Sequence, residues 1–167
     1  FLELTADNID LMNINPIQYQ RVFPAKKDLQ SKIELYKELG NGYTYLGFNL
    51  RKAPFNDIKV RQALNYAIDK EEVIKGVLLG LGESISSPYK PGTRWNNPNL
   101  NPYPYKPKKA LKLLKDAGYI KNRKGILLKD AKPLKYEIIT NQNKQREMTA
   151  VLIQRRLKEI GIKVSIR

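Results

Sequence analysis

The sequence predicts a mixed fold of helices and strands, of the α/β class, and three observations support this prediction. Apolar and polar residues alternate from 43 to 50 as in a strand, and apolar residues recur at helical spacing from 58 to 78 and from 107 to 117. A strand–helix–strand pattern then fills residues 134–166. With 167 residues, 41% of them hydrophobic, the chain is long and apolar enough to bury a core.

The first 42 residues carry only weak patterns. Pro16 is placed to open a short helix that runs through Val22, because proline suits the first turn of a helix. Residues 31–39 indicate a strand that ends at the Gly40-Asn-Gly42 turn.

Residues 43–50 form the clearest strand pattern, and its two faces differ. The apolar face comprises Thr44, Leu46, Phe48 and Leu50. The other face comprises Tyr43, Tyr45, Gly47 and Asn49. Two phenols, an amide and a residue without a side chain suit a ligand that lies close against the backbone. The alternative is a half-exposed strand with ordinary surface tyrosines, since Tyr is common in strands.

A helix is expected after Pro54, which breaks the strand. Asn56 or Asp57 can cap this helix at its N-terminus. Its core-facing stripe comprises Val60, Ala63, Leu64, Ala67 and Ile68. Arg61 lies off the stripe and is expected to be either the partner in a structural ion pair or a ligand contact.

A second helix follows at once, because Asp69 and Glu72 have the spacing of a capping box. Its apolar residues are Val73, Ile74, Val77 and Leu78, and Gly80 or Gly82 ends it. Asp69 paired with Glu71 or Glu72 could also belong to an enzyme that uses two carboxylates. The cap and the acidic first turn explain these residues better.

A long irregular segment, residues 86–107, separates this helix from the next. It contains prolines at positions 88, 91, 98, 102 and 104 and the aromatic residues Tyr89, Trp95, Tyr103 and Tyr105. Loops of this length are functional or disordered, and aromatic residues among prolines favour an ordered, packed loop. The next helix begins near Pro107 and ends at Gly118. Its inward residues are Ala110, Leu111, Leu114 and Ala117.

The C-terminal part indicates a hairpin and then a crossover. Residues 126–128 and 134–140 flank a Lys-Asp-Ala-Lys turn and are expected to form the hairpin. A helix from about 145 to 160 carries an apolar stripe and ends at Gly161. The strand 162–166 should then lie parallel to the strand before the helix, in a right-handed crossover. The pattern stops without a closing turn, so we expect a fragment.

Composition narrows the functional classes. The chain has no Cys and no His, so thiolate chemistry, disulfides and Cys-based zinc sites are absent and the commonest general base is missing. The net charge of +15 raises the alternative of a nucleic-acid-binding domain. The basic residues between Lys106 and Lys135 are almost all Lys, however, without the Arg forks and stacking aromatic residues that base readers use.

Four segments resemble one known family. Tyr45-Leu-Gly-Phe-Asn-Leu50 with Val60-Arg-Gln-Ala-Leu-Asn-Tyr-Ala-Ile-Asp-Lys70 is similar to the central signature of the extracytoplasmic solute-binding proteins for oligopeptides, dipeptides and nickel complexes. Other motifs of the same family resemble one segment before this signature, Asp7–Leu11, and two segments after it, Tyr105–Tyr119 and Gln154–Val164. Their consistent order extends the resemblance over about residues 7–166.

The resemblance implies part of a two-lobed, periplasmic-binding-protein-like fold that closes on its ligand. Residues 1–42 would be the end of the first lobe and the approach to the hinge, and residues 43–167 the first half of the second lobe, an incomplete domain. The implied function is to bind peptides, or alternatively a nickel complex or another small solute, and deliver them to the permease subunits of an ABC transporter. The ligand-binding candidates comprise Tyr43, Tyr45, Asn49 and Trp95.

The same resemblance implies that the protein is not an enzyme and needs no cofactor, metal or nucleic acid. It would lie in the periplasm or elsewhere outside the cytoplasm, either free or lipid-anchored to the cell surface, and meet the membrane only through an anchor or the permease. Two positions depart from the family pattern. Lys106 replaces an N-capping Asp, which should weaken that helix end by about 0.5–1.5 kcal/mol. Ala131 replaces a turn Gly, which argues against a positive φ there.

Overall fold

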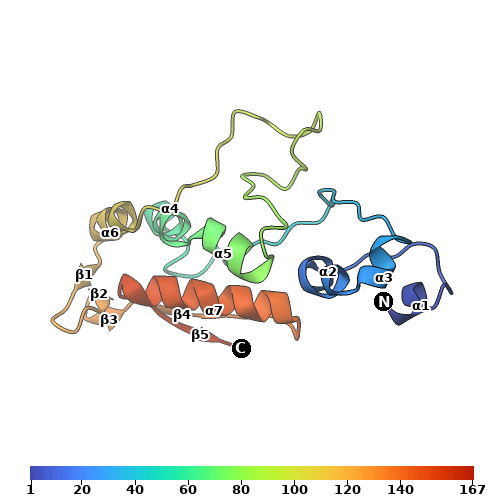
Figure 1. The fold of residues 1–167 in the computed structure, drawn as a ribbon. Coiled ribbons are helices and arrows are strands. Elements are labelled where there is room, and N and C mark those ends of the chain that lie inside the picture. The colour runs from blue at the N-terminus through green and yellow to red at the C-terminus, as the bar shows by residue number, and fades with distance from the viewer.

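The computed structural model describes residues 1–167 and has two parts, a small helical unit and a larger mixed body (Figure 1). The helices of the small unit are α1 (Leu2–Thr5), the π-helix η1 (Gln18–Val22), α2 (Phe23–Ala25) and α3 (Lys27–Gln30). The helices of the larger body are α4 (Ile58–Ala67), α5 (Lys70–Val77), α6 (Pro107–Asp116) and α7 (Lys144–Glu159). The strands are β1 (Ile120–Lys121), β2 (Leu127–Lys129), β3 (Lys132–Pro133), β4 (Lys135–Ile138) and β5 (Lys163–Ile166).

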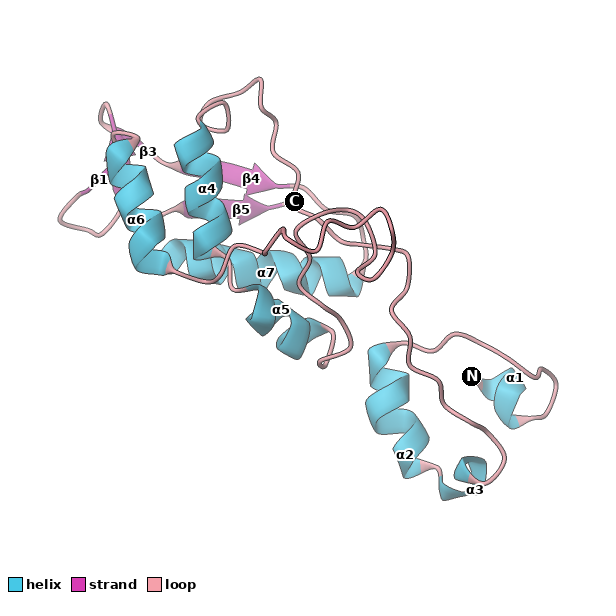
Figure 2. Ribbon diagram, turned by 90° about the horizontal axis from the view of Figure 1, so that it is seen from above, coloured by secondary structure: helices cyan, strands magenta, loops and turns pink.

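The small unit lies at the opposite end of the molecule from α6 and the short strands, and both views show this separation (Figures 1 and 2). The predicted helix that opens at Pro16 is confirmed, and η1 and α2 carry it on to Ala25. The predicted strand over residues 31–39 is wrong, because this stretch contains a turn and then no regular structure.

One continuous apolar core holds the larger body together. The core-facing stripe of α4 is confirmed, since Val60, Ala63, Leu64 and Ala67 are buried, while Ile68 packs at the edge of the core. Helix α6 packs directly on α4, and α7 closes the core from the other side. The other buried residues of the core lie in or directly beside α6, the strands and α7, and they are Ala110, Leu114, Ala117, Leu127, Leu134, Ile138, Ala150, Ile153, Leu157, Ile160 and Ile162.

The strands form two small sheets. Strands β1, β2 and β3 form an antiparallel sheet, and β4 and β5 pair in parallel, with Lys135 opposite Lys163 and Ile138 opposite Ile166. The predicted strand–helix–strand crossover is therefore confirmed as β4–α7–β5. The predicted hairpin is only partly correct, because β2 turns back into the two-residue β3. The longer strand after it, β4, pairs with β5 instead.

The turn between β2 and β3 contradicts one expectation. Asp130 and Ala131 both adopt the left-handed region, with φ of 49° and 59°. Two successive positive φ values match the tight hairpin turn whose twist suits the flanking strands. The inference that alanine excludes a positive φ at position 131 was wrong, because the short hairpin imposes that conformation on the chain.

The helix ends follow the predicted signals. Asp57, Asp69 and Asn143 cap α4, α5 and α7, each by accepting a hydrogen bond from a backbone N–H in the first turn. Lys106 makes no such bond at the start of α6, as expected from its side chain. Gly161 ends α7 with a φ of +95° and lies against the carbonyl oxygen of Gly125. None of the helices is both long enough and apolar enough to cross a membrane.

Candidate functional site

The segment from Tyr43 to Phe48 runs between the two parts of the molecule with its backbone unpaired. The strand predicted for residues 43–50 is not formed, although the segment contains no turn or bend before Leu50. No backbone N–H or carbonyl of residues 43–48 takes part in a hydrogen bond. The side-chain pattern suits a strand, but a strand forms only where a second segment lies alongside to pair with it.

Two side chains fasten this segment to the core. Leu46 and Phe48 are partly buried and pack against the core of the larger body. The ring of Phe48 stacks on Phe55 with centroids 5.3 Å apart, and Phe55 meets Tyr136 of β4 edge-on at 5.2 Å. This line of three rings holds the segment in place without backbone pairing. Thr44 and Leu50, predicted for the same face, are exposed instead.

The predicted polar face points outward. Tyr43 and Tyr45 are exposed, and their rings lie 5.7 Å apart. Gly47 leaves room for the Tyr45 ring, because a Cβ at that position would lie 3.3 Å from it. Asn49 is also exposed, and its Oδ1 accepts a hydrogen bond of 3.1 Å from the Arg51 N–H. The structure therefore brings Tyr43 and Tyr45 together on one accessible surface, with Asn49 engaged in the turn that follows.

Trp95 lies apart from this pair. It is 63% exposed in the irregular segment before α6, and the guanidinium of Arg94 sits 4.2 Å from its ring centroid. Trp95 forms no ring contact with either tyrosine. The structure thus does not join Trp95 to the Tyr43–Asn49 surface.

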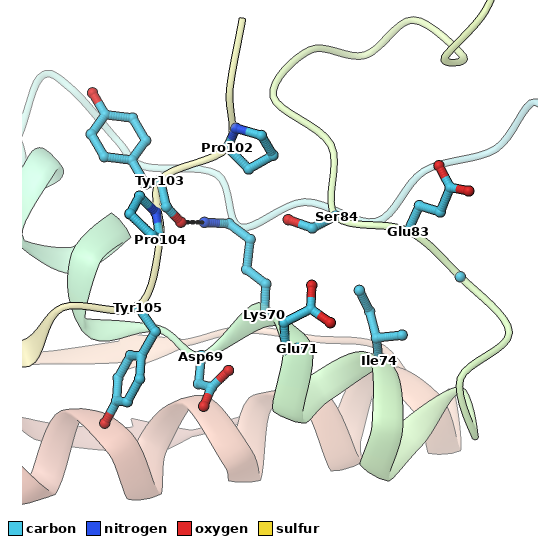
Figure 3. Close-up of a pocket in the computed structure, with 11 residues that line it drawn as sticks. Asp69, Lys70, Glu71, Ile74, Glu83, Ser84, Pro102, Tyr103, Pro104 and Tyr105 are labelled. Atoms are coloured by element: carbon cyan, nitrogen blue, oxygen red, sulfur yellow. Dashed lines mark hydrogen bonds between the residues drawn. The ribbon is translucent and has the colours of Figure 1, made fainter.

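A second concave region, which the sequence did not suggest, lies beside the start of α5 (Figure 3). It is an open hollow of about 570 Å³. Three stretches of chain line it: Asp69, Lys70, Glu71 and Ile74; Gly82, Glu83 and Ser84; and Pro102, Tyr103, Pro104 and Tyr105. None of the four predicted site residues lines this hollow. The only signals of this hollow in the sequence were the capping box of Asp69 and Glu72 and the proline-flanked tyrosines Tyr103 and Tyr105, and more than 30 positions separate the two.

Lys70 occupies the middle of the hollow (Figure 3). Its ammonium donates a hydrogen bond of 3.1 Å to the Tyr103 carbonyl, and partial burial lowers the pKa of Lys70. The Tyr103 ring meets Tyr66 of α4 edge-on at 4.9 Å. Lys70 therefore ties the irregular segment to α5, and charged side chains line the hollow together with prolines and tyrosines. No group of three acidic side chains here or elsewhere is arranged to hold a metal ion.

The remaining candidate side chains serve the scaffold. Arg61 donates a hydrogen bond of 2.7 Å to the Phe55 carbonyl, so it supports the backbone rather than an ion pair. Glu72 accepts hydrogen bonds from Arg155 and from Arg156 of α7, the latter at 2.7 Å. That pairing raises the pKa of Arg156. Asp69 and Glu72 are thus occupied by a helix cap and by ion pairs between α5 and α7, rather than by an acid–base pair.

Comparison with known proteins gives one consistent result. The family described as "Bacterial extracellular solute-binding proteins, family 5 Middle" matches residues 1–167. The oligopeptide-binding protein AppA of Bacillus subtilis is 36% identical over 167 residues, which are 97% of this chain and 30% of that protein.

Solved structures agree with this match. The nonapeptide complex of AppA from Bacillus subtilis superposes with a TM-score of 0.81 at 35% identity over 99% of this chain. NikZ from Campylobacter jejuni, in complex with Ni(L-His), gives a TM-score of 0.81 at 32% identity over the same share. The chain spans about a third of the length of each of these two proteins.

Proposed function

Because the chain belongs to family 5 of the bacterial extracellular solute-binding proteins, we propose that it is part of the substrate-binding component of an ABC transporter. The whole protein binds peptides by closure of two lobes and delivers them to a membrane permease. Residues 1–42 are the end of the first lobe and the approach to the hinge, and residues 43–167 are the first half of the second lobe. The two-part shape, joined by residues 33–57 without helix or strand, supports this division (Figure 2).

The unpaired backbone of residues 43–48 is the observation that carries this proposal. An extended peptide recognises such an edge through main-chain hydrogen bonds, which are independent of the peptide's own side chains. Tyr43 and Tyr45 flank this edge and offer broad, rigid surfaces to peptide side chains. Asn49 ends the edge, and Trp95 contributes from its loop when the lobes close.

A nickel complex or other small solute is the second candidate for the same site. The structural relative from Campylobacter jejuni holds nickel together with free histidine, so the solute itself can supply imidazole. This chain has no histidine of its own, which makes a complex that brings its ligands more suitable than a bare ion. Peptides remain the first candidate because an unpaired backbone matches them directly.

The proposal also implies a cellular location and a set of partners for the protein. It acts as a binding protein rather than an enzyme, in the periplasm or at the outer side of the cell membrane, with permease subunits as its partners. A lipid anchor would retain it at the cell surface. In this role the ligand stabilises the closed arrangement of the lobes, and the permease receives the closed form.

Calorimetric titration of the full-length protein with a mixed peptide pool and with nickel–histidine tests the function. We expect heat from the peptide pool, and a Tyr45→Ala variant should bind about 5–30-fold more weakly, a loss of about 1–2 kcal/mol. Tyr36→Ala is the matched control, because Tyr36 is equally exposed but hydrogen-bonds only Glu34. Heat from neither pool would refute the proposed function, and equal weakening in both variants would refute the site.

A further inference from the structure

One end of the molecule carries a concentration of positive charge that the proposed peptide site does not use. We call this surface the basic end. It comprises residues 106–135, from the start of α6 through β1–β3 to the first residue of β4. Its eleven basic residues, opposed by only two acidic ones in the same stretch, are Lys106, Lys108, Lys109, Lys112, Lys115, Lys121, Arg123, Lys124, Lys129, Lys132 and Lys135. All eleven side chains are exposed.

The charge of the basic end is not neutralised within the chain. None of the eleven residues takes part in any ion pair of the structure. Only two of the ammonium groups have a recorded contact: Lys109 lies over the Tyr66 ring at 4.4 Å, and Lys129 donates to the Ala117 carbonyl at 2.8 Å. The others remain available to an external anion.

The lysines of α6 are arranged on one face. Lys108, Lys112 and Lys115 are spaced by four and three residues, so they form a stripe along the helix. The opposite face of α6 carries Ala110 and Leu114, which are buried in the core. The stripe therefore cannot turn inward, and it presents three cations to solvent together.

Exposed apolar side chains accompany these cations. Ile120 in β1 is 68% exposed beside Lys121, and Ile58 at the start of α4 is 58% exposed. Ile58 belongs to the same end of the molecule, because its neighbour Lys59 donates a hydrogen bond of 3.2 Å to the Asp116 carbonyl of α6. Cations combined with exposed isoleucines suit the boundary between lipid headgroups and acyl chains.

We propose that the basic end docks on a bilayer surface that contains anionic phospholipids. Lysines act as mobile point charges, which suit a fluid layer of phosphates. The fixed fork of Arg suits a phosphate of defined position and geometry instead. The basic end also lacks a row of aromatic residues for stacking nucleotide bases. Its one aromatic residue, Tyr119, is half-buried, and the Lys129 ammonium lies 5.6 Å from the centroid of its ring. This adds a direct membrane contact to the anchor and permease contacts that the resemblance implies.

The location of the basic end leaves the peptide site free. Figures 1 and 2 both place α6 and β1–β3 at the end of the molecule remote from the small helical unit. The Tyr43–Phe48 segment leads away from that unit, and its Phe48 ring stacks on Phe55. A protein docked through its basic end therefore keeps this segment accessible to ligand.

Vesicle flotation tests the proposal with the full-length protein produced without lipid modification. At 50 mM salt we expect binding to vesicles with 30% phosphatidylglycerol and none to pure phosphatidylcholine. Each lysine near an anionic surface contributes about a fivefold factor, so Lys108→Gln/Lys112→Gln/Lys115→Gln should weaken binding on the order of 100-fold. High salt should abolish binding, because screening shortens the range of surface charges to about 3 Å at 1 M.

The control variant is Lys27→Gln/Lys37→Gln/Lys52→Gln, which removes the same charge from exposed positions outside the basic end. It should bind vesicles like the unaltered protein. Equal binding to neutral vesicles, equal loss in both triple variants, or no binding to anionic vesicles would overturn the proposal. Tighter binding to a single- or double-stranded oligonucleotide at equal phosphate concentration would overturn it in favour of nucleic acid. Peptide calorimetry on both variants separates this result from any failure of the proposed transport function.

Discussion

Tyr136 offers a sharp test of how the candidate peptide segment is fastened to the core. Its ring ends the line that runs from Phe48 through Phe55, and its hydroxyl is buried without any hydrogen-bond partner. An unpaired buried polar group costs about 1–3 kcal/mol. Tyr136→Phe keeps the ring contacts and removes that cost. We expect the variant to be more stable at pH 7 by about 1 kcal/mol.

The pH dependence supplies a second and independent signature of the same group. Burial raises the pKa of Tyr136 far above its usual value of about 10, so the folded protein keeps the phenol protonated while the unfolded chain releases the proton. Below pH 10 the phenol is protonated in both the folded and the unfolded protein, so its ionisation does not affect stability there. Stability is lost as pH rises above 10, because only the unfolded chain then gains from releasing the proton. Above pH 10, each pH unit should therefore reduce the stability of the unaltered protein by about 1.4 kcal/mol more than that of Tyr136→Phe.

Urea unfolding of both proteins at pH 7 and at several values above pH 10 measures both effects. Phenolate absorbance adds a direct observation, because the Tyr136 phenol should ionise only as the protein unfolds. If Tyr136→Phe loses 1 kcal/mol or more at pH 7, the hydroxyl has a partner in the full-length protein and the reasoning fails. A stability difference that does not change above pH 10 would show that the phenol is open to solvent.

Three other substitutions probe the scaffold, each by urea unfolding. Glu72→Gln should lower the free energy of unfolding by about 1–3 kcal/mol, since the pair with Arg156 joins α5 to α7. A double-mutant cycle with Arg156→Gln should give a coupling energy above about 0.5 kcal/mol, and additive effects would contradict this. Ala131→Gly should stabilise by about 0.5–1 kcal/mol, because φ is 59° there, and a loss would indicate that the turn changes shape. Gly161→Ala should cost at least about 2 kcal/mol, since the new Cβ would meet the carbonyl oxygen of Gly125; a neutral result would show that β2 can move away.

Local signals predicted the helices well. The stripes of α4 and α7 and the caps at Asp57 and Asp69 depend on residues within one or two helical turns, so their pattern is present in the sequence itself. The crossover was predictable for a related reason, because a strand, a helix and a strand in succession have few possible arrangements.

Pairing between distant segments was predicted less well. Residues 43–50 have the side-chain pattern of a strand, yet no other part of this chain pairs with them. Residues 135–138 pair with β5 rather than with β2, and the sequence pattern of either partner allows both choices. Strand pairing depends on which segments the rest of the fold brings alongside, and periodicity alone does not contain that information.

The candidate site was predictable only in part. The exposed pair Tyr43 and Tyr45 followed directly from alternation, because residues two apart share a face in extended chain. The hollow around Lys70 was missed because three separate stretches of chain meet there. Trp95 was chosen for its residue type within a proline-rich loop, and the structure places it against Arg94 instead of the tyrosines.

Hydrogen exchange of the full-length protein, with and without saturating peptide, tests the central claim most directly. Hydrogen bonds from the bound peptide to the free backbone of residues 43–48 should slow the exchange of these amides at least tenfold. The amides of α6 and β1–β3, which lie away from the peptide segment, should be unchanged and serve as the internal reference. Unchanged exchange at residues 43–48, in a sample in which calorimetry shows peptide bound, would contradict the account.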